Sequence, residues 1–117
     1  MKRDLDLIRE ILLTLEAETP LEAIAGHTIQ DLNAHLVLAI EAGLLVGATQ
    51  PLAGLEDDWP LAIVQRLSWA GYDFLDAARS PNRWAQVRSQ ILKAGGQWTL
   101  DLVKELLQQE LRSQLGL

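Results

Sequence analysis

The sequence predicts a mainly α-helical fold with a small β-hairpin, a winged helix-turn-helix-like domain with additional C-terminal helices. Apolar residues recur at helical spacing in several segments, and two short β-type runs follow a pair of helices. A chain of 117 residues is long enough to bury one continuous core. We therefore predict a single domain over residues 1–117, with a winged-helix core over 1–79 and a C-terminal helical extension over 80–117.

The first expected helix spans about residues 4–17. Asp4 is placed to cap its start, and Thr19-Pro20 ends it. The second expected helix begins at Thr28, where Asp31 approximates a capping box, and Gly43 closes it. In both helices the expected buried residues lie three or four positions apart. They are Leu5, Ile8, Leu12 and Leu15 in the first helix, and Ile29, Leu32, Leu36 and Ile40 in the second.

Two β-type runs, 44–48 and 59–67, predict the hairpin, and Pro60 restricts the start of the second run to an edge position. Ser68 is expected to cap a helix that runs to about Arg79. Ser80-Pro81 opens the next helix, which Gly95-Gly96 ends, and Thr99 caps the last one. The last helix has a leucine-rich stripe, which we expect to pack on the first helix or on a second copy of the chain. The predicted core is Ile8, Leu12, Leu32, Leu36, Ile40, Leu67, Phe74 and Leu75.

Composition excludes several classes of protein. The apolar stretches, such as 36–40, are far shorter than the roughly 20 residues that a membrane-spanning helix needs. The absence of cysteine excludes disulfides, thiolate metal sites and thiol nucleophiles. No export signal is visible at the start of the chain, where two acids follow the first bases at once. We expect a cytoplasmic protein.

Several ordered segments of the chain are also those of a known family. They are MKRDLDLIREIL over 1–12, His35, EAGLL over 41–45, LSWAGYDFLDAAR over 67–79 and LGL over 115–117. Together they resemble the family called domain of unknown function 2513, and the resemblance covers nearly the whole chain. It implies a winged-helix-like fold and a frequent origin in phages or prophages. It implies no activity, because the family has no established catalytic or binding residues.

Candidate catalytic or metal-binding residues do not converge in the sequence. His35 lies four residues after Asp31 on one helix face, but two ligands do not make a zinc site. Glu56, Asp57 and Asp58 are consecutive acids in a loop and lack the fixed separation that acid–base catalysis needs. We therefore predict no enzyme activity, no metal and no cofactor. The four tryptophans are predicted to lie in the core rather than to form a base-stacking platform; they are Trp59, Trp69, Trp84 and Trp98.

The charge distribution argues against the DNA-binding role that a winged helix suggests. No lysine or arginine lies between Arg9 and Arg66, although residues 10–65 hold nine acids. The presumptive recognition helix, 28–42, therefore has no lysine or arginine that could neutralise a phosphate. We predict instead that its acidic surface contacts another protein, and that a basic partner fits this surface best. The expected contact residues are Asp31, Val37 and Glu41 on the helix and Glu56, Asp57 and Asp58 on the wing.

Four alternatives stay open. The chain can be an acidic decoy that occupies a nucleic-acid-binding protein. The acids can simply form a solvated surface. The chain can be a DNA-binding transcriptional regulator that contacts nucleic acid through Arg79, Arg83 and Arg88 in its C-terminal half, where bases outnumber acids seven to five over 66–117. It can also form a homodimer.

Overall fold

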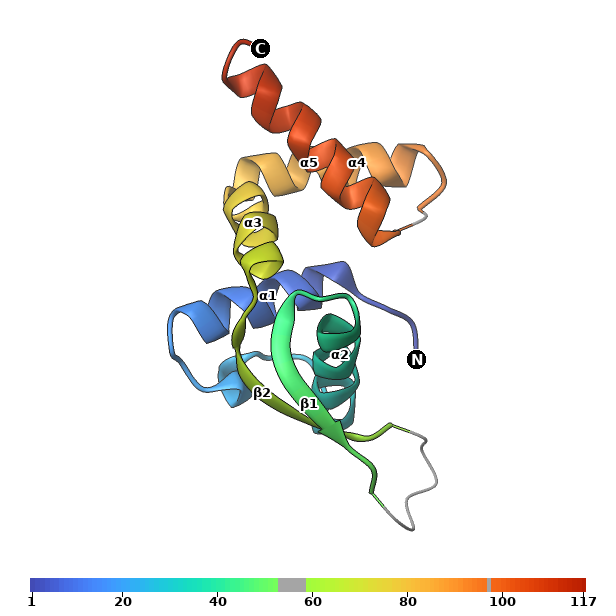
Figure 1. The fold of residues 1–117 in the computed structure, drawn as a ribbon. Helices are drawn as coiled ribbons and strands as arrows, with labels where there is room; N and C mark the ends of the chain where they lie inside the picture. The colour runs from blue at the N-terminus through green and yellow to red at the C-terminus, as the bar shows by residue number, and fades with distance from the viewer. Residues whose placement is uncertain (53–58, 97) are drawn as a thin grey trace. The chain divides into compact units, whose positions relative to one another are not determined.

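The computed structural model of the protein describes residues 1–52, 59–96 and 98–117. The described part of the chain is mainly helical with one two-stranded antiparallel sheet, which confirms the predicted combination of helices and a β-hairpin (Figure 1). The elements in chain order are α1 (Leu5–Glu16), the 3-10 helix η1 (Leu21–Ala23), α2 (Ile29–Glu41), β1 (Leu45–Gln50), β2 (Leu61–Leu67), α3 (Trp69–Ala78), α4 (Pro81–Lys93) and α5 (Leu100–Gln114).

The chain divides into two compact units, residues 1–72 (unit 1) and residues 73–117 (unit 2). The division falls inside α3, whereas we expected the winged-helix core to end after Arg79. Unit 1 contains α1, η1, α2, both strands and the first turn of α3. Unit 2 contains the rest of α3 with α4 and α5. The prediction of a single domain stays a prediction, and the two units are described separately.

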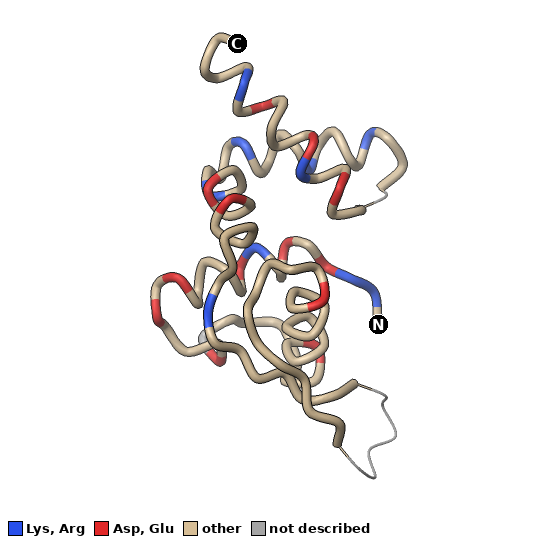
Figure 2. The backbone as a smooth tube through the Cα atoms, in the orientation of Figure 1, with Lys and Arg blue, Asp and Glu red and all other residues tan. Residues whose placement is uncertain are grey.

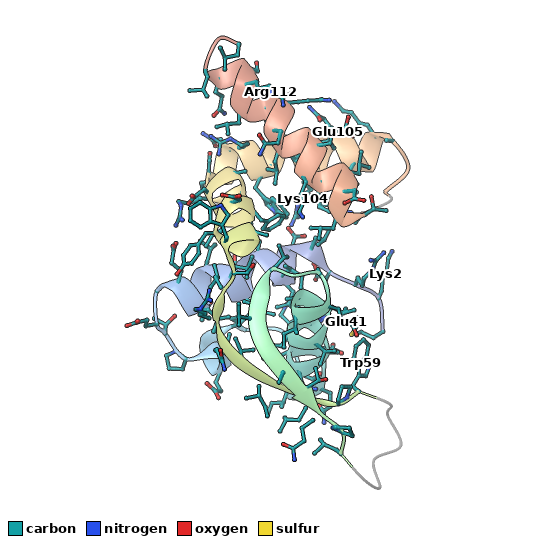
Figure 3. The ribbon with its side chains drawn as sticks, viewed as in Figure 1. Lys2, Glu41, Trp59, Lys104, Glu105 and Arg112 are labelled. Carbon is teal, nitrogen blue, oxygen red and sulfur yellow. The ribbon has the colours of Figure 1, made fainter. Side chains whose placement is uncertain are left out.

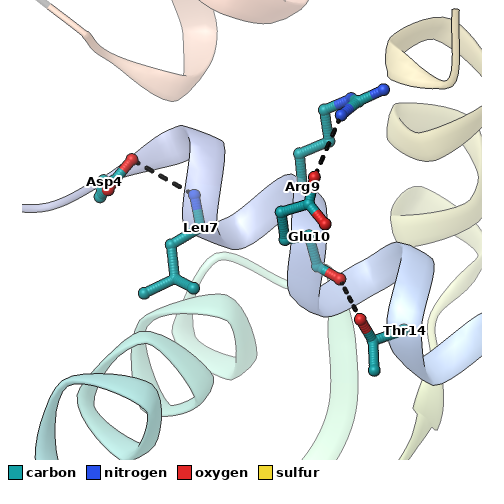
Figure 4. A network of polar contacts seen from close by, with 5 residues as sticks. All are labelled: Asp4, Leu7, Arg9, Glu10 and Thr14. Atoms are coloured by element: carbon teal, nitrogen blue, oxygen red, sulfur yellow. Dashed lines mark hydrogen bonds and ion pairs between the residues drawn. The ribbon is translucent and has the colours of Figure 1, made fainter. Parts of the chain in front are cut away.

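Helix boundaries follow the capping residues identified in the sequence. The Asp4 carboxylate accepts a hydrogen bond from the amide of Leu7 at 3.2 Å, at the start of α1 (Figure 4). In the same way Thr28 caps α2, Ser68 caps α3, Ser80 caps α4 and Thr99 caps α5. Gly43 follows the C-cap residue Ala42 and adopts a positive φ of 77°, which is the backbone geometry that ends the helix. These local predictions are confirmed.

In unit 1, α2 packs against α1 and against both strands of the hairpin (Figure 1). Five of the six predicted core residues of unit 1 are buried and Ile40 is half-buried, while Phe74 and Leu75, the other two predicted core residues, are buried in unit 2. The predicted stripe of α2 was wrong at its start, because Ile29 is 77% exposed. The helix is enclosed on more than one side and therefore buries more than one row of residues. Its buried residues are Leu32, Ala34, His35, Leu36, Val37 and Ala39.

The hairpin pairs Leu45 with Leu67 at one end and Gln50 with Leu61 at the other, with a bulge next to Gly47. Its base is joined to the first turn of α3. The amide of Ser68 donates to the carbonyl of Leu44 at 3.0 Å, and the Ser68 hydroxyl donates to the carbonyl of Gly43. Because the Leu44 backbone lies so close to α3, a Cβ at Gly71 would stand 2.0 Å from the Leu44 oxygen.

In unit 2, α5 packs on α4, a partner that we did not expect. The ring of Trp84 lies at the centre of this unit, 6.3 Å from the ring of Phe74 and 6.0 Å from that of Trp98 between ring centroids. Val103 and Leu107 supply the buried side of α5. The last helix therefore has an apolar partner within its own unit, and its leucine stripe does not by itself require a second copy.

Candidate interaction surface

The helix expected to read a partner, α2, is largely an internal element of unit 1. Val37 is only 2% exposed, so the prediction that it lies near the centre of a partner contact was wrong. The error arises because α1 and the hairpin both cover α2, and the row of residues beside the predicted stripe is buried as well. Asp31 is half-buried, and Glu41 is exposed at the last residue of α2 (Figure 3). Only these two of the three predicted α2 contacts reach solvent.

The acidic part of the predicted contact on the wing is Glu56, Asp57 and Asp58. These three residues lie outside the described residues. Their role in binding stays a prediction from the sequence.

His35 is buried at 2% exposure and joins α2 to the start of α1. Its Nε2 accepts a hydrogen bond from the Asp4 amide at 3.0 Å, and its Nδ1 lies 2.7 Å from the carbonyl oxygen of Asp31. A carbonyl can only accept, so Nδ1 carries the proton. The Asp31–His35 spacing thus produces a backbone contact rather than a pair of metal ligands. Among the described residues no three His, Asp or Glu side chains gather as a metal site.

The three arginines of the alternative nucleic-acid surface are partly engaged within unit 2. Arg79 forms an ion pair with Asp76 at 2.9 Å. Arg83 donates to the carbonyl of Ala77 at 2.8 Å, near the end of α3, and to the side chain of Gln114 at 2.7 Å. Arg88 is exposed on α4, but it lies about 140° around the helix axis from Arg83. Arg83 and Arg88 therefore flank opposite sides of the buried stripe of α4 and do not form one basic patch on it.

Unit 1 instead exposes aromatic and aliphatic side chains on β2 and at the start of α3. Trp69 is 84% exposed, which overturns its predicted place in the core, and Tyr72, one turn further along, is 45% exposed. On β2, Leu61 and Ile63 are 42% and 47% exposed. They alternate with half-buried Ala62 and Val64, so they lie on the outward face of the hairpin. Among the other tryptophans, Trp84 is buried as predicted, and Trp59 and Trp98 are half-buried.

The charges of unit 1 are strongly unbalanced. Residues 1–72 hold eleven acids and four bases, and two of the bases are Lys2 and Arg3 at the N-terminus. The strand β1 carries no charged residue (Figure 2). Residues 73–117 hold five acids and six bases. The exposed apolar side chains of unit 1 thus belong to the acidic unit.

No helix in the described part of the chain is both long enough and apolar enough to cross a membrane. No solved structure matches the chain. A protein of Haemophilus influenzae, described as "Uncharacterized protein", is 28% identical over 115 residues, and the match spans 92% of this chain and 93% of that protein. The sequence model of a family described as "Hypothetical protein (DUF2513)" matches residues 2–97. Because that match covers most of the chain and includes the segments quoted above except Met1 and the LGL at 115–117, the chain belongs to the DUF2513 family.

Proposed function

We propose that this chain is a non-enzymatic, winged-helix-like module that binds another protein, and the exposure of Trp69 is the observation that carries the proposal. Tryptophan is a large apolar residue that is enriched among the residues that dominate binding energy at protein interfaces. A tryptophan that is 84% exposed contributes little to the stability of the fold. Tyr72 lies next to it on the helix surface, so the two rings present an aromatic pair to solvent.

The winged-helix part of the proposal rests on element order. Two helices joined by the short η1 segment precede an antiparallel hairpin, as in a helix-turn-helix with a wing. The position of the recognition helix is then occupied by α2. Since α2 is largely buried and has no lysine or arginine, we place the binding surface on the hairpin and on the first turn of α3 instead.

The rival proposal is a DNA-binding transcriptional regulator. Its basic residues would have to come mainly from unit 2, where Arg79 and Arg83 already have acceptors within the chain. An origin in a phage or prophage and a cytoplasmic location are part of our proposal and were expected from the family resemblance and the composition.

Site-specific photocrosslinking in the native host tests the protein-binding proposal. A benzoylphenylalanine in place of Trp69 is expected to give a discrete protein adduct, and the same group in place of exposed Glu18 serves as the control. The captured protein is then purified, and its affinity for Trp69→Ala is expected to fall at least about tenfold, as for an interface residue worth more than 1 kcal/mol. Circular dichroism should be unchanged.

Two results would count against this function. One is the absence of any adduct from position 69 above the Glu18 control. The other is nanomolar, sequence-selective binding of duplex DNA by the intact chain, which would favour the regulator.

A further inference from the structure

The two outer edges of the hairpin differ in whether their backbone groups have hydrogen-bond partners. At the start of β2 the outer edge is already bonded to a side chain of α2. The side chain of Asn33 donates to the carbonyl of Pro60 at 2.8 Å and accepts from the amide of Ala62 at 2.9 Å. Pro60 itself has no amide hydrogen to offer. The bulge opposite the Val46–Gly47 step interrupts the ladder further along, and Arg66 adds a charge near its end. Bulges, proline and charge are the features by which proteins protect a sheet edge from pairing.

The pairing register shows which groups of β1 face outward. The Ala62 amide donates a hydrogen bond to the Asn33 side chain, so this amide points away from β1. Thr49 is the partner of Ala62, and in an antiparallel ladder both members of such a pair direct their N–H and C=O groups away from each other. The same holds for Gly47, two residues earlier and opposite Val64. Within the described residues, no backbone group outside the ladder bonds to the outward groups of Gly47 and Thr49.

The edge of β1 also lacks the usual protection. Within the strand itself, LVGATQ, there is no charged residue and no proline, and Pro51 stands just beyond its end as Pro60 stands just before β2. The second half of the strand, 48–50, is exposed. Such an edge presents a short row of unpaired donors and acceptors that an additional strand can use.

We propose that the free edge of β1 accepts an extended, positively charged segment of a partner protein as a third strand of the sheet. This inference rests on the proposal that unit 1 binds protein, and it specifies the partner's conformation and charge. The charge follows from the excess of seven acids over bases in residues 1–72. A second copy of the chain would bring two such acidic units together along a strand of only six residues, so it is a poorer occupant.

Nuclear magnetic resonance of the intact, isotope-labelled chain tests this edge without knowledge of the natural partner. The probe is a capped hexapeptide of alternating lysine and valine, and its control is the hexapeptide of alternating glutamate and valine. Titration with the lysine peptide is expected to shift the Gly47 and Thr49 amide signals and to slow their hydrogen exchange at least about threefold. The glutamate peptide should bind at least about tenfold more weakly, and added salt should reduce the difference.

A pair of variants separates strand pairing from side-chain contact. Thr49→Pro removes an outward amide hydrogen without removing a donor to β2. It is expected to weaken binding of the lysine peptide at least about tenfold. Thr49→Val keeps the amide and should bind as the wild type does. If Thr49→Pro does not fold, the exchange measurement on the wild type still decides the question.

Three results would overturn the inference. They are no protection of Gly47 and Thr49 at millimolar lysine peptide, equal binding of both peptides, and protection that rises with protein concentration alone, which would indicate self-pairing. If the photocrosslink at position 69 fails while the lysine peptide protects β1, then Trp69 is not at the binding site, but the edge of β1 still is. If the crosslink succeeds and the edge stays unprotected, only the edge is wrong.

Discussion

Replacing Gly71 with alanine has two opposing effects on the free energy of unfolding, and the structure decides which of them is larger. Helix propensity alone favours alanine by about 1 kcal/mol within a helix. In the folded protein, however, the new Cβ would stand 2.0 Å from the Leu44 oxygen and 3.0 Å from the Leu44 carbonyl carbon. Both are backbone atoms, so relief requires α3 and the chain before β1 to move apart.

That movement has an estimable cost. Overpacking of this kind typically costs about 1 to 3 kcal/mol. The Leu44 oxygen also accepts the amide of Ser68 at 3.0 Å, and weakening that bond adds about 0.5 to 1.5 kcal/mol. After the gain in helix propensity, we expect Gly71→Ala to lower the free energy of unfolding by about 1 to 3 kcal/mol.

Urea denaturation followed by circular dichroism measures this change. For a domain of this size, a loss of about 2 kcal/mol corresponds to a midpoint roughly 1 M lower at an unchanged slope. The exposed neighbour provides the control, because Ala70→Gly should lose only the propensity term of about 1 kcal/mol or less. A Gly71→Ala protein with a midpoint equal to or above that of the wild type would refute the reasoning.

Three further predictions concern the core, the last helix and DNA. His35→Ala should lower the free energy of unfolding by about 2 to 4 kcal/mol in denaturant unfolding, since it leaves a cavity and an unpaired Asp4 amide. His35→Gln should cost less, because its side-chain oxygen can replace Nε2 as the acceptor. Equal losses in the two variants would show that this acceptor is unimportant. Deleting residues 99–117 should expose the apolar stripe of α4 and cause aggregation or loss of stability. A truncated chain that sediments as a monomer with wild-type stability would contradict the packing of α5 on α4. Duplex DNA should bind the intact chain with a dissociation constant no better than about 10⁻⁶ to 10⁻⁴ M at physiological salt, and anisotropy showing nanomolar binding would contradict the charge argument.

Helix and hairpin positions were predictable from the sequence because their signals are local. The hydroxyl of Thr28 needs only the amide three residues later, at 3.0 Å, to cap α2. Gly43 needs only its own backbone freedom to end that helix. The expected second run, 59–67, likewise contains β2 (Leu61–Leu67), with Pro60 just outside the strand.

The surface residues were predicted less well because exposure depends on which faces of an element are covered. The spacing of Leu32 and Leu36 indicates one buried face of α2, but it does not reveal that a second neighbour also buries Val37. The predicted interface on α2 therefore included a core residue. The apolar character of Trp69 similarly predicted burial, although apolar residues also make up much of a folded protein's surface.

The sequence by itself determined where the helices begin and end, where the hairpin lies, the family of the chain and the strong acidity of its first 72 residues. All of these depend on residue identity and on neighbours a few positions away. Only the tertiary structure decided that α2 is internal, that Arg83 donates to a carbonyl near the end of α3, and that Asn33 occupies the outer edge of β2. Only the tertiary structure, likewise, shows that no described backbone group outside the ladder bonds to the outer edge of β1. These features depend on contacts between residues far apart in the sequence, for which neither periodicity nor composition carries a signal.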